Sequence, residues 1–257
     1  MLKPKKSLGQ NFLTDQNVIK KIINLKNIKD RNIVEIGPGN GALTDKIINE
    51  RPSSLILIEK DKFLFNHLKD KYKNNKKIKF YNDDILKINL EKIIKNNSII
   101  FGNLPYNISS QILVKLIKFK KWPPKFSDLI LMFQKEVAEK ISGKSYGRLS
   151  IISNYRLKTE RKFNISANCF FPKPKVISSV LHLSPTINVD FNIENLNNLE
   201  YLTNLFFSNR RKIIKKKIQK IFNSDQIKQF KNLNLNYRPS ELNKEFYYKA
   251  TVIFERG

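Results

Sequence analysis

Four short apolar runs, each followed by a glycine-containing or polar turn, constrain the fold of this chain more than any other feature. They are rich in Ile, Leu, Val and Phe, as buried strands are. The runs cover Asn32–Ile36, Leu55–Ile58, Ile78–Tyr81 and Ser98–Phe101. Strand and helix patterns alternate from Ile33 to Phe133, which is typical of right-handed crossovers between parallel strands. The sequence therefore predicts an α/β fold built on a parallel sheet.

The turn after the first run contains three glycines at alternate positions. Gly37, Gly39 and Gly41 precede a helix predicted over Ala42–Asn49. Glycine permits a positive φ and a close approach to the main chain, so a cofactor can lie against this turn. The spacing Gly-x-Gly-x-Gly differs from the Gly-x-Gly-x-x-Gly spacing of dinucleotide-binding proteins.

The other three runs end in polar groups. Glu59 follows the second run, about 20 residues after the glycine turn, where an acidic side chain meets ribose hydroxyls in such folds. Asp83 and Asp84 follow the third run, in a position suited to the amino group of an adenine. Ligands of open α/β sheets bind at the carboxyl ends of the strands. These side chains therefore predict one ligand site.

The fourth run leads into Asn103-Leu104-Pro105-Tyr106. The Asn103 amide oxygen and a backbone carbonyl fixed by Pro105 can each accept one N–H bond of an adenine amine. This arrangement would hold the nitrogen in place and let its electron density build toward an electrophile. The Tyr106 ring offers a stacking face to a flipped-out base. Taken alone, the tetrad is also compatible with an ordinary strand-to-helix turn.

With these motifs in place, the chain resembles the small-subunit ribosomal RNA adenine dimethyltransferases, the family of the bacterial kasugamycin-sensitivity enzyme. The matching segments, in order, are Ser7–Leu13, Gly37–Thr44, Phe101–Ser109, Gln134–Ala138, Tyr146–Ser150, Phe170–Val176 and Asn209–Lys212. The resemblance implies a Rossmann-like methyltransferase sheet with a small all-helical C-terminal domain. It also implies S-adenosylmethionine as methyl donor. The implied target is two adjacent adenosines near the 3′ end of small-subunit rRNA, each methylated twice on N6.

The resemblance also implies roles for individual residues. The donor site would include Asn11, Leu13, Gly37, Gly39, Glu59, Asp84 and Asn103. The target base would meet Asn103, Leu104, Pro105 and Tyr106, with Phe170 as a second stacking face. Phe171 is adjacent, so the sequence leaves open which of the two rings faces the base. Lys60, directly after Glu59, departs from the family pattern and is expected to stay solvated.

Charge indicates the kind of partner. The chain has 49 Lys and Arg against 22 Asp and Glu, a formal net charge of +27, and a pI near 10.0. Such an excess indicates a polyanionic partner. Here that partner would be small-subunit rRNA within the immature 30S subunit. The compositional bias of an A/T-rich genome would also add lysines, but it would scatter them over the surface.

The densest basic cluster lies on a helix predicted over residues 211–222. Its expected RNA-binding residues are Arg210, Arg211, Lys212, Lys216 and Lys220. Lys212, Lys216 and Lys220 would form one row at i, i+4 spacing, where like charges repel each other unless phosphates face them. A solvated lysine face is the alternative interpretation of this cluster.

The chain is predicted to divide into a catalytic domain, residues 1–185, and a helical RNA-binding domain, residues 186–257. One cysteine allows no disulfide within the chain and no Cys-ligated zinc, and neither histidine has a metal-ligand spacing, so no metal is predicted. No signal-peptide pattern follows Met1 and no apolar segment approaches the roughly 20 residues of a membrane span. We expect a cytoplasmic monomer.

Two other functions remain compatible with parts of the sequence. One is a large-subunit rRNA adenine methyltransferase of the macrolide-resistance type, although Leu104 and the segments 170–176 and 209–212 favour the small-subunit enzyme. The other is a non-catalytic RNA-binding factor of ribosome assembly. An intact donor pocket argues against it, because binding alone would not need one.

Overall fold

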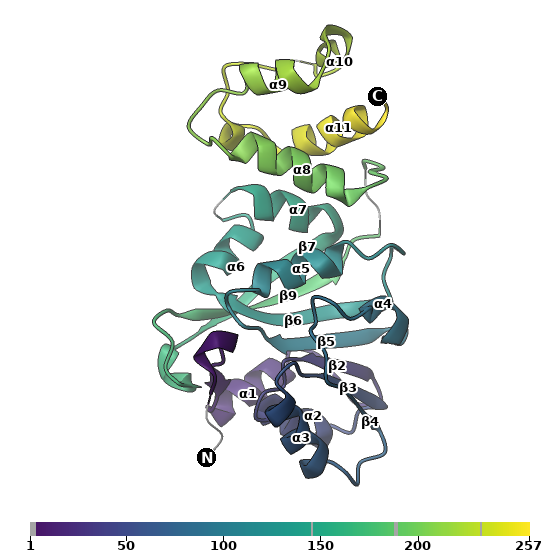
Figure 1. Cartoon of the computed structure of the whole chain (residues 1–257), viewed down its shortest axis with the longest axis vertical. Helices are drawn as coiled ribbons and strands as arrows, with labels where there is room; N and C mark the ends of the chain where they lie inside the picture. Colours follow the sequence, from purple (N-terminus) through teal and green to yellow (C-terminus); the bar gives the residue numbers. More distant parts are fainter. Residues whose placement is uncertain (1–3, 145, 188–189, 232) are drawn as a thin grey trace. The chain divides into compact units, whose positions relative to one another are not determined.

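The computed structural model describes residues 4–144, 146–187, 190–231 and 233–257 (Figure 1). Its contacts divide the chain into two compact units. The first runs to Glu139 and includes Leu157–Pro185, and the second contains Lys140–Arg156 and Thr186–Gly257. The predicted boundary after residue 185 coincides with one of these divisions, but residues 140–156 group with the C-terminal helices. The assignment of functions to domains 1–185 and 186–257 stays a prediction.

A seven-stranded mixed sheet forms the centre of the first unit, with strand order β4-β3-β2-β5-β6-β9-β7. The first five strands of this order, from β4 through β6, are parallel to one another. β9 is antiparallel to both of its neighbours, β6 and β7. The strands are β2 (Asn32–Ile36), β3 (Ser54–Ile58), β4 (Ile78–Tyr81), β5 (Ser98–Asn103), β6 (Phe126–Gln134), β7 (Leu157–Ile165) and β9 (Ser178–Pro185). The predicted α/β methyltransferase-like fold is confirmed.

The strand ends deliver the functional side chains to one edge of the sheet. β2 and β4 have the predicted bounds, whereas β5 continues past Phe101 because Gly102 and Asn103 pair with Leu131 and Met132 of β6. Asn103 is therefore the last residue of β5. Gly102 before it pairs with β2 on one side and β6 on the other, and Asn103 itself pairs with β6. A strand end fixed in this way positions a side chain more rigidly than a loop would.

Helices cover the two faces of this sheet. They are η1 (Lys6–Leu8), α1 (Gln16–Ile23), α2 (Ala42–Asn49), α3 (Lys62–Lys71), α4 (Leu90–Ile93), α5 (Ser109–Ile117) and η2 (Ala167–Cys169), and α6 (Lys135–Ile141) follows β6 directly. Figure 1 shows α1, α2 and α3 on one side of the sheet and α4 and α5 on the other. The sequence leaves Thr14 and Asp15 open as the cap of α1. In the structure Asp15 caps it by accepting from two backbone N–H groups, and Ile19, Ile22 and Ile23 are buried.

A second, two-stranded sheet joins the N-terminal motif, residues 7–13, to the proline-rich segment 170–176. β1 (Phe12–Leu13) pairs antiparallel with β8 (Phe170–Phe171), with Phe12 opposite Phe171 and Leu13 opposite Phe170. Leu13 and Phe170 belong to the buried core that α1 and α2 form with the sheet. Segments that lie more than 150 residues apart in sequence thus meet beside the glycine turn.

The second unit is helical and has an aromatic core. Its helices are α7 (Arg148–Arg156), α8 (Leu196–Phe207), α9 (Lys215–Ile221), α10 (Ser224–Lys228), η3 (Pro239–Glu241) and α11 (Lys244–Glu255). Phe206 packs edge-on against Phe246 and Tyr247 with ring centroids 5.6 and 5.8 Å apart. Such contacts add to the stabilisation from apolar burial.

The predicted basic helix over residues 211–222 is wrong at its start. The structure has a turn from Ser208 to Arg211, and α9 begins only at Lys215. The backbone N–H groups of Ile214 and Lys215 donate to Tyr237 O and Leu235 O. These N–H groups therefore bond to a later segment of the chain and not within a helical turn. Lys212 therefore lies outside α9, and the predicted i, i+4 row does not form.

The last helix is also shifted from its predicted bounds of Pro239–Ala250. Pro239–Glu241 is a separate 3-10 turn, and α11 starts at Lys244 because the Asn243 side chain accepts from Phe246 N. Proline at a first helical turn and asparagine at an N-cap are competing start signals. In this chain the asparagine marks the start of the long helix.

Candidate active site

The glycine turn after β2 leaves main chain open to a ligand. Gly37 and Gly39 have φ values of +67° and +60°. A Cβ on Gly39 would lie 3.0 Å from two ring carbons of Phe12, so a larger residue is excluded by both conformation and space. Gly39 N also donates to Glu59 Oε2 at 3.1 Å, which links the turns after β2 and β3.

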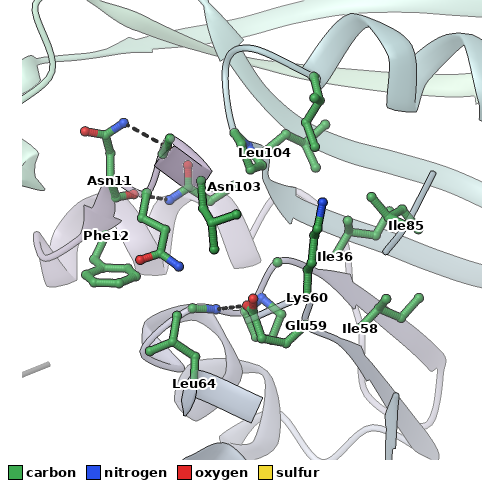
Figure 2. Close-up of a pocket in the computed structure, with 18 of the residues that line it drawn as sticks. Asn11, Phe12, Ile36, Ile58, Glu59, Lys60, Leu64, Ile85, Asn103 and Leu104 are labelled. Atoms are coloured by element: carbon green, nitrogen blue, oxygen red, sulfur yellow. Dashed lines mark hydrogen bonds between the residues drawn. The ribbon is translucent and has the colours of Figure 1, made fainter. Parts of the chain in front are cut away.

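Glu59 is a buried carboxylate in the wall of the cavity. The residue is 7% exposed, and its Oε1 accepts from Asp61 N at 2.8 Å. Ile36, Ile58 and Leu64 surround it (Figure 2). Burial raises the pKa of Glu59, while the N–H donors of Asp61 and Gly39 oppose that shift. A carboxyl group held here can accept further hydrogen bonds from hydroxyl groups of a ligand.

Asp84 follows β4 on the same edge of the sheet. Its Oδ1 accepts from Leu86 N and its Oδ2 from Lys60 Nζ, both at 2.9 Å. The Leu86 hydrogen bond, followed by that from Lys60, holds the pKa of Asp84 below its usual range. The Lys60 side chain is 57% exposed, but its ammonium group pairs with Asp84, so the expectation that Lys60 stays solvated is only partly met. Each Asp84 oxygen retains a lone pair for another donor.

The N-terminal motif orients the amide of Asn103. Asn103 Nδ2 donates to the main-chain oxygen of Asn11 at 2.8 Å, and Asn11 Nδ2 donates to Gly9 O at 3.3 Å (Figure 2). Within the part of the chain that the structure describes, Asn103 Oδ1 has no hydrogen-bond donor. The side chain therefore presents an acceptor to the cavity, as the sequence predicts for an adenine amine.

The rest of the tetrad continues the same wall. Leu104 is buried, and its Cδ2 would be 2.6 Å from a Cβ on Gly102, so a side chain at Gly102 would displace the end of this leucine. Tyr106 is half-buried, and its hydroxyl lies 2.5 Å from Ser178 Oγ. Burial raises the pKa of Tyr106, which keeps the ring neutral. Leu104, Pro105 and Tyr106 all line the same cavity.

The structure brings together every residue predicted for the donor site. The cavity is lined by Asn11, Leu13, Gly37, Gly39, Glu59, Asp84 and Asn103 together with the tetrad. Its empty space is about 1130 Å³, which includes solvent at its open mouth. Carboxylates for ribose and amine groups, apolar side chains for a base and exposed main chain at glycines fit an adenosine-containing donor.

Phe170 is placed differently from the other predicted site residues. It is 4% exposed, belongs to the core cluster and does not line the cavity. Phe171, in contrast, is 51% exposed. The stacking role of Phe170 stays a prediction, and no other aromatic of this loop lines the cavity in the described residues.

The predicted RNA-binding residues lie in the second unit. All five are exposed: Arg210, Arg211, Lys212, Lys216 and Lys220. Lys217 between them has another task, since its Nζ donates to Leu205 O and Phe206 O at 2.8 Å and satisfies carbonyls at the end of α8. The RNA-binding assignment of the five exposed residues stays a prediction.

Sequence reasoning missed two buried acids at this edge of the sheet. Glu35 lines the cavity, is 1% exposed and accepts from Thr44 Oγ1 at 2.7 Å; burial raises its pKa to about 8. Asp61 accepts from Lys5 Nζ at 2.9 Å and from Gln10 Nε2 at 3.2 Å, which fastens the N-terminal motif to the turn after β3. Their position in the sequence could have identified them, because Glu35 lies two residues before Gly37 and Asp61 two residues after Glu59.

A Rossmann-like sheet that ends in antiparallel β9 and β7, with a glycine turn, an acid after β3 and an Asn-Leu-Pro-Tyr tetrad after β5, defines an S-adenosylmethionine-dependent methyltransferase. The model of the family described as ribosomal RNA adenine dimethylase matches residues 1–255, and the chain belongs to this family. The resemblance stated from the motifs is thus confirmed.

Individual relatives agree with this assignment. Ribosomal RNA small subunit methyltransferase A of Pelagibacter ubique is 41% identical, over 99% of this chain and 98% of that protein. A dimethyladenosine transferase structure from Plasmodium falciparum superposes with a TM-score of 0.72 at 24% identity, covering 95% of this chain and 98% of that chain. The 23S rRNA methyltransferase ErmE gives 0.70 at 21% identity with the same coverage. These two structures establish the shared fold.

Two features are absent from the described residues. No three His, Cys, Asp or Glu side chains gather as a possible metal site within residues 4–144, 146–187, 190–231 and 233–257. In the same residues, no helix has the length and apolar character needed to cross a membrane.

Proposed function

We propose that the protein dimethylates the exocyclic N6 of two adjacent adenosines near the 3′ end of small-subunit rRNA, as part of ribosome biogenesis. The observation that carries this proposal is the orientation of Asn103, whose Nδ2 is held by Asn11 O while Oδ1 faces the cavity. An adenine amine has two N–H groups. Asn103 Oδ1 can accept a hydrogen bond from one of them, and the backbone carbonyl that Pro105 fixes can accept from the other. The base would stack on Tyr106.

The donor would supply an electrophilic methyl group on a sulfonium. Glu59 would accept hydrogen bonds from its ribose, and Asp84 from its adenine amine. Asn103 would raise the electron density on the target nitrogen and hold it in line with the methyl carbon. The nitrogen loses its proton as it is alkylated, so a strong general base is not required.

The choice of the small-subunit target is supported by the relatives with high sequence identity. Similarity of fold does not discriminate, because the dimethyladenosine transferase and the 23S rRNA methyltransferase superpose almost equally well. The proposal includes immature 30S subunits as the physiological substrate and a monomeric, cytoplasmic enzyme.

One experiment separates the candidate targets. The protein is incubated with methyl-labelled S-adenosylmethionine and, separately, unmethylated small subunits, large subunits and naked rRNA. Label in small-subunit rRNA supports the proposal, and label in large-subunit rRNA alone supports the macrolide-resistance type of enzyme. No label in any acceptor, with donor binding intact, would support a non-catalytic assembly factor.

A further inference from the structure

The loop between β8 and β9 is fastened at both ends to the active site. Before the loop, Cys169 O accepts from Thr14 N at 2.8 Å and from Thr14 Oγ1 at 3.0 Å, so it is tied to the strand that carries Phe12 and Leu13. After the loop, Ser178 Oγ meets the hydroxyl of Tyr106 at 2.5 Å. Residues 172–177 are thus held beside the predicted target base.

The two faces of the β1–β8 ribbon have different environments. Residues directly opposite each other in an antiparallel pair project from the same face. Leu13 and Phe170 share one face and belong to the core, and Leu13 also lines the cavity. Phe12 and Phe171 share the other face, on which Phe12 lies against Gly39 and lines the donor cavity. Phe171 therefore projects from the same face of the ribbon as Phe12, and half of it is exposed.

The loop combines apolar and basic side chains that the described protein leaves uncovered. Phe171, Val176 and Ile177 are 51%, 40% and 45% exposed. Lys173 and Lys175 are exposed, and neither ammonium group has an ion-pair partner among the described residues. No Asp or Glu occurs between Ile165 and Pro185. An aromatic ring flanked by unneutralised lysines is the composition of a single-stranded nucleic-acid surface.

We propose that this loop binds the RNA nucleotide next to the adenosine in the active site, with its base stacked on Phe171 and its phosphates on Lys173 and Lys175. The inference rests on the proposed function and extends it. Two adjacent adenosines are modified, so while one is in the cavity the other lies one nucleotide away. The exposed ring of Phe171 shares a ribbon face with Phe12, which lines that cavity, and the positive charge of the loop favours RNA over an apolar protein surface.

The test uses an RNA hairpin of the small-subunit 3′ end in which one of the two adenosines is replaced by 2-aminopurine, whose fluorescence is quenched by stacking. The wild type is expected to quench it. Phe171→Leu should lose most of this quenching and bind the hairpin about 5- to 100-fold more weakly, whereas Phe171→Tyr should resemble the wild type. Lys173→Gln with Lys175→Gln should flatten the salt dependence of binding, because these lysines contact phosphate.

Two controls make the outcome decisive. Unchanged affinity of Phe171→Leu for S-adenosylmethionine shows that the variant is folded. Gln at Lys73 and Lys76 removes the same charge near the amino end of β4, at the opposite edge of the sheet from the site, and should leave binding unchanged.

The inference is overturned if the wild type does not quench, or if Phe171→Leu quenches as the wild type does. It is also overturned if the loop variants lose affinity for whole subunits but not for the hairpin, because a ribosomal protein would then be the occupant. Methylation of small subunits by the wild type, measured in parallel, shows whether only this inference fails or the proposed function fails with it.

Discussion

The Asn103 amide has one hydrogen-bonded end and one that faces the cavity. Its Nδ2 donates to Asn11 O. A rotation that exchanged Nδ2 and Oδ1 would break this hydrogen bond between β5 and the N-terminal segment. The protein thus orients the acceptor before any base arrives. Pre-organised groups of this kind stabilise a transition state more than flexible ones do.

Asn103→Ala is expected to lower the rate of methyl transfer by a factor of about 10²–10³, the effect typical of removing one pre-organised hydrogen-bonding group. Donor affinity should change less, because Glu59 and Asp84 remain. Single-turnover transfer to unmethylated small subunits measures the rate, with Asn74→Ala in the loop before β4 as a matched amide control. A variant rate above about a tenth of the wild-type rate would contradict the role assigned to Asn103.

Glu59→Ala is expected to weaken S-adenosylmethionine binding by roughly 1.5–3 kcal/mol, the scale of hydrogen bonds to a charged group. RNA affinity should be nearly unchanged. Calorimetry measures the donor affinity, and Glu50→Ala, at the end of α2, removes a carboxylate that is 40% exposed as a control. Donor affinity equal to that of the wild type would make Glu59 only a support for the glycine turn.

Glu35 predicts a pH dependence of stability. Burial raises its pKa from 4.5 in the unfolded chain to about 8 in the folded one. The folded state therefore binds the extra proton between these values, and its stability falls as pH rises through this window. Glu35→Gln removes this dependence.

Urea unfolding of both proteins at about pH 5.5 and pH 8 measures the effect. The wild type should lose up to roughly 3 kcal/mol relative to the Gln variant over this interval, at 1.36 kcal/mol per pH unit. Parallel pH profiles of the two proteins would mean that Glu35 is ionised in the fold.

At the scale of elements, hydrophobic periodicity predicted where helices and strands lie better than where they begin. β2, β4 and α2 have their predicted bounds because turn residues lie directly next to the apolar pattern. Around α9 the apolar residues at helical spacing face inward: Ile214, Ile218 and Phe222 are buried and Ile221 is half-buried. Its start was wrong because the carbonyls of Leu235 and Tyr237 bind the N–H groups of Lys215 and Ile214, and no local pattern reveals such a partner.

The basic surface around α9 has its own test. Replacing Lys212, Lys216 and Lys220 with Gln should weaken subunit binding. It should also reduce the slope of log affinity against log salt by up to about 0.7–0.9 for each phosphate that is no longer neutralised. Lys217 is kept because it supports the end of α8. The positions of the methylated bases should not change, because lysines that bind phosphate do not read sequence.

The matched variant carries Gln at Lys69, Lys73 and Lys76, which are exposed on and after α3. Filter binding at several salt concentrations measures both slopes. Equal slopes for the two triple variants would mean that the lysines around α9 are solvated, as compositional bias alone predicts.

At the scale of the whole molecule, the sequence predicted the sheet edge and the donor residues because they lie at strand ends, where chain order determines position. It did not predict which face of the β1–β8 ribbon each Phe occupies. That depends on the register of Phe12 with Phe171, set by a pairing between distant segments. Nor did it predict the ties from Asp61 to Lys5 and Gln10, which are long-range side-chain interactions.

The central claim is that this sheet edge transfers methyl groups to the N6 of neighbouring adenosines. The most direct measurement is mass spectrometry of nuclease fragments of small-subunit rRNA, after unmethylated subunits have reacted to completion with the protein and S-adenosylmethionine. We predict N6,N6-dimethyladenosine at two adjacent positions near the 3′ end, formed about 10²–10³ times more slowly by the Asn103→Ala variant. Methyl groups on carbon, on ribose or on scattered adenosines would contradict the account.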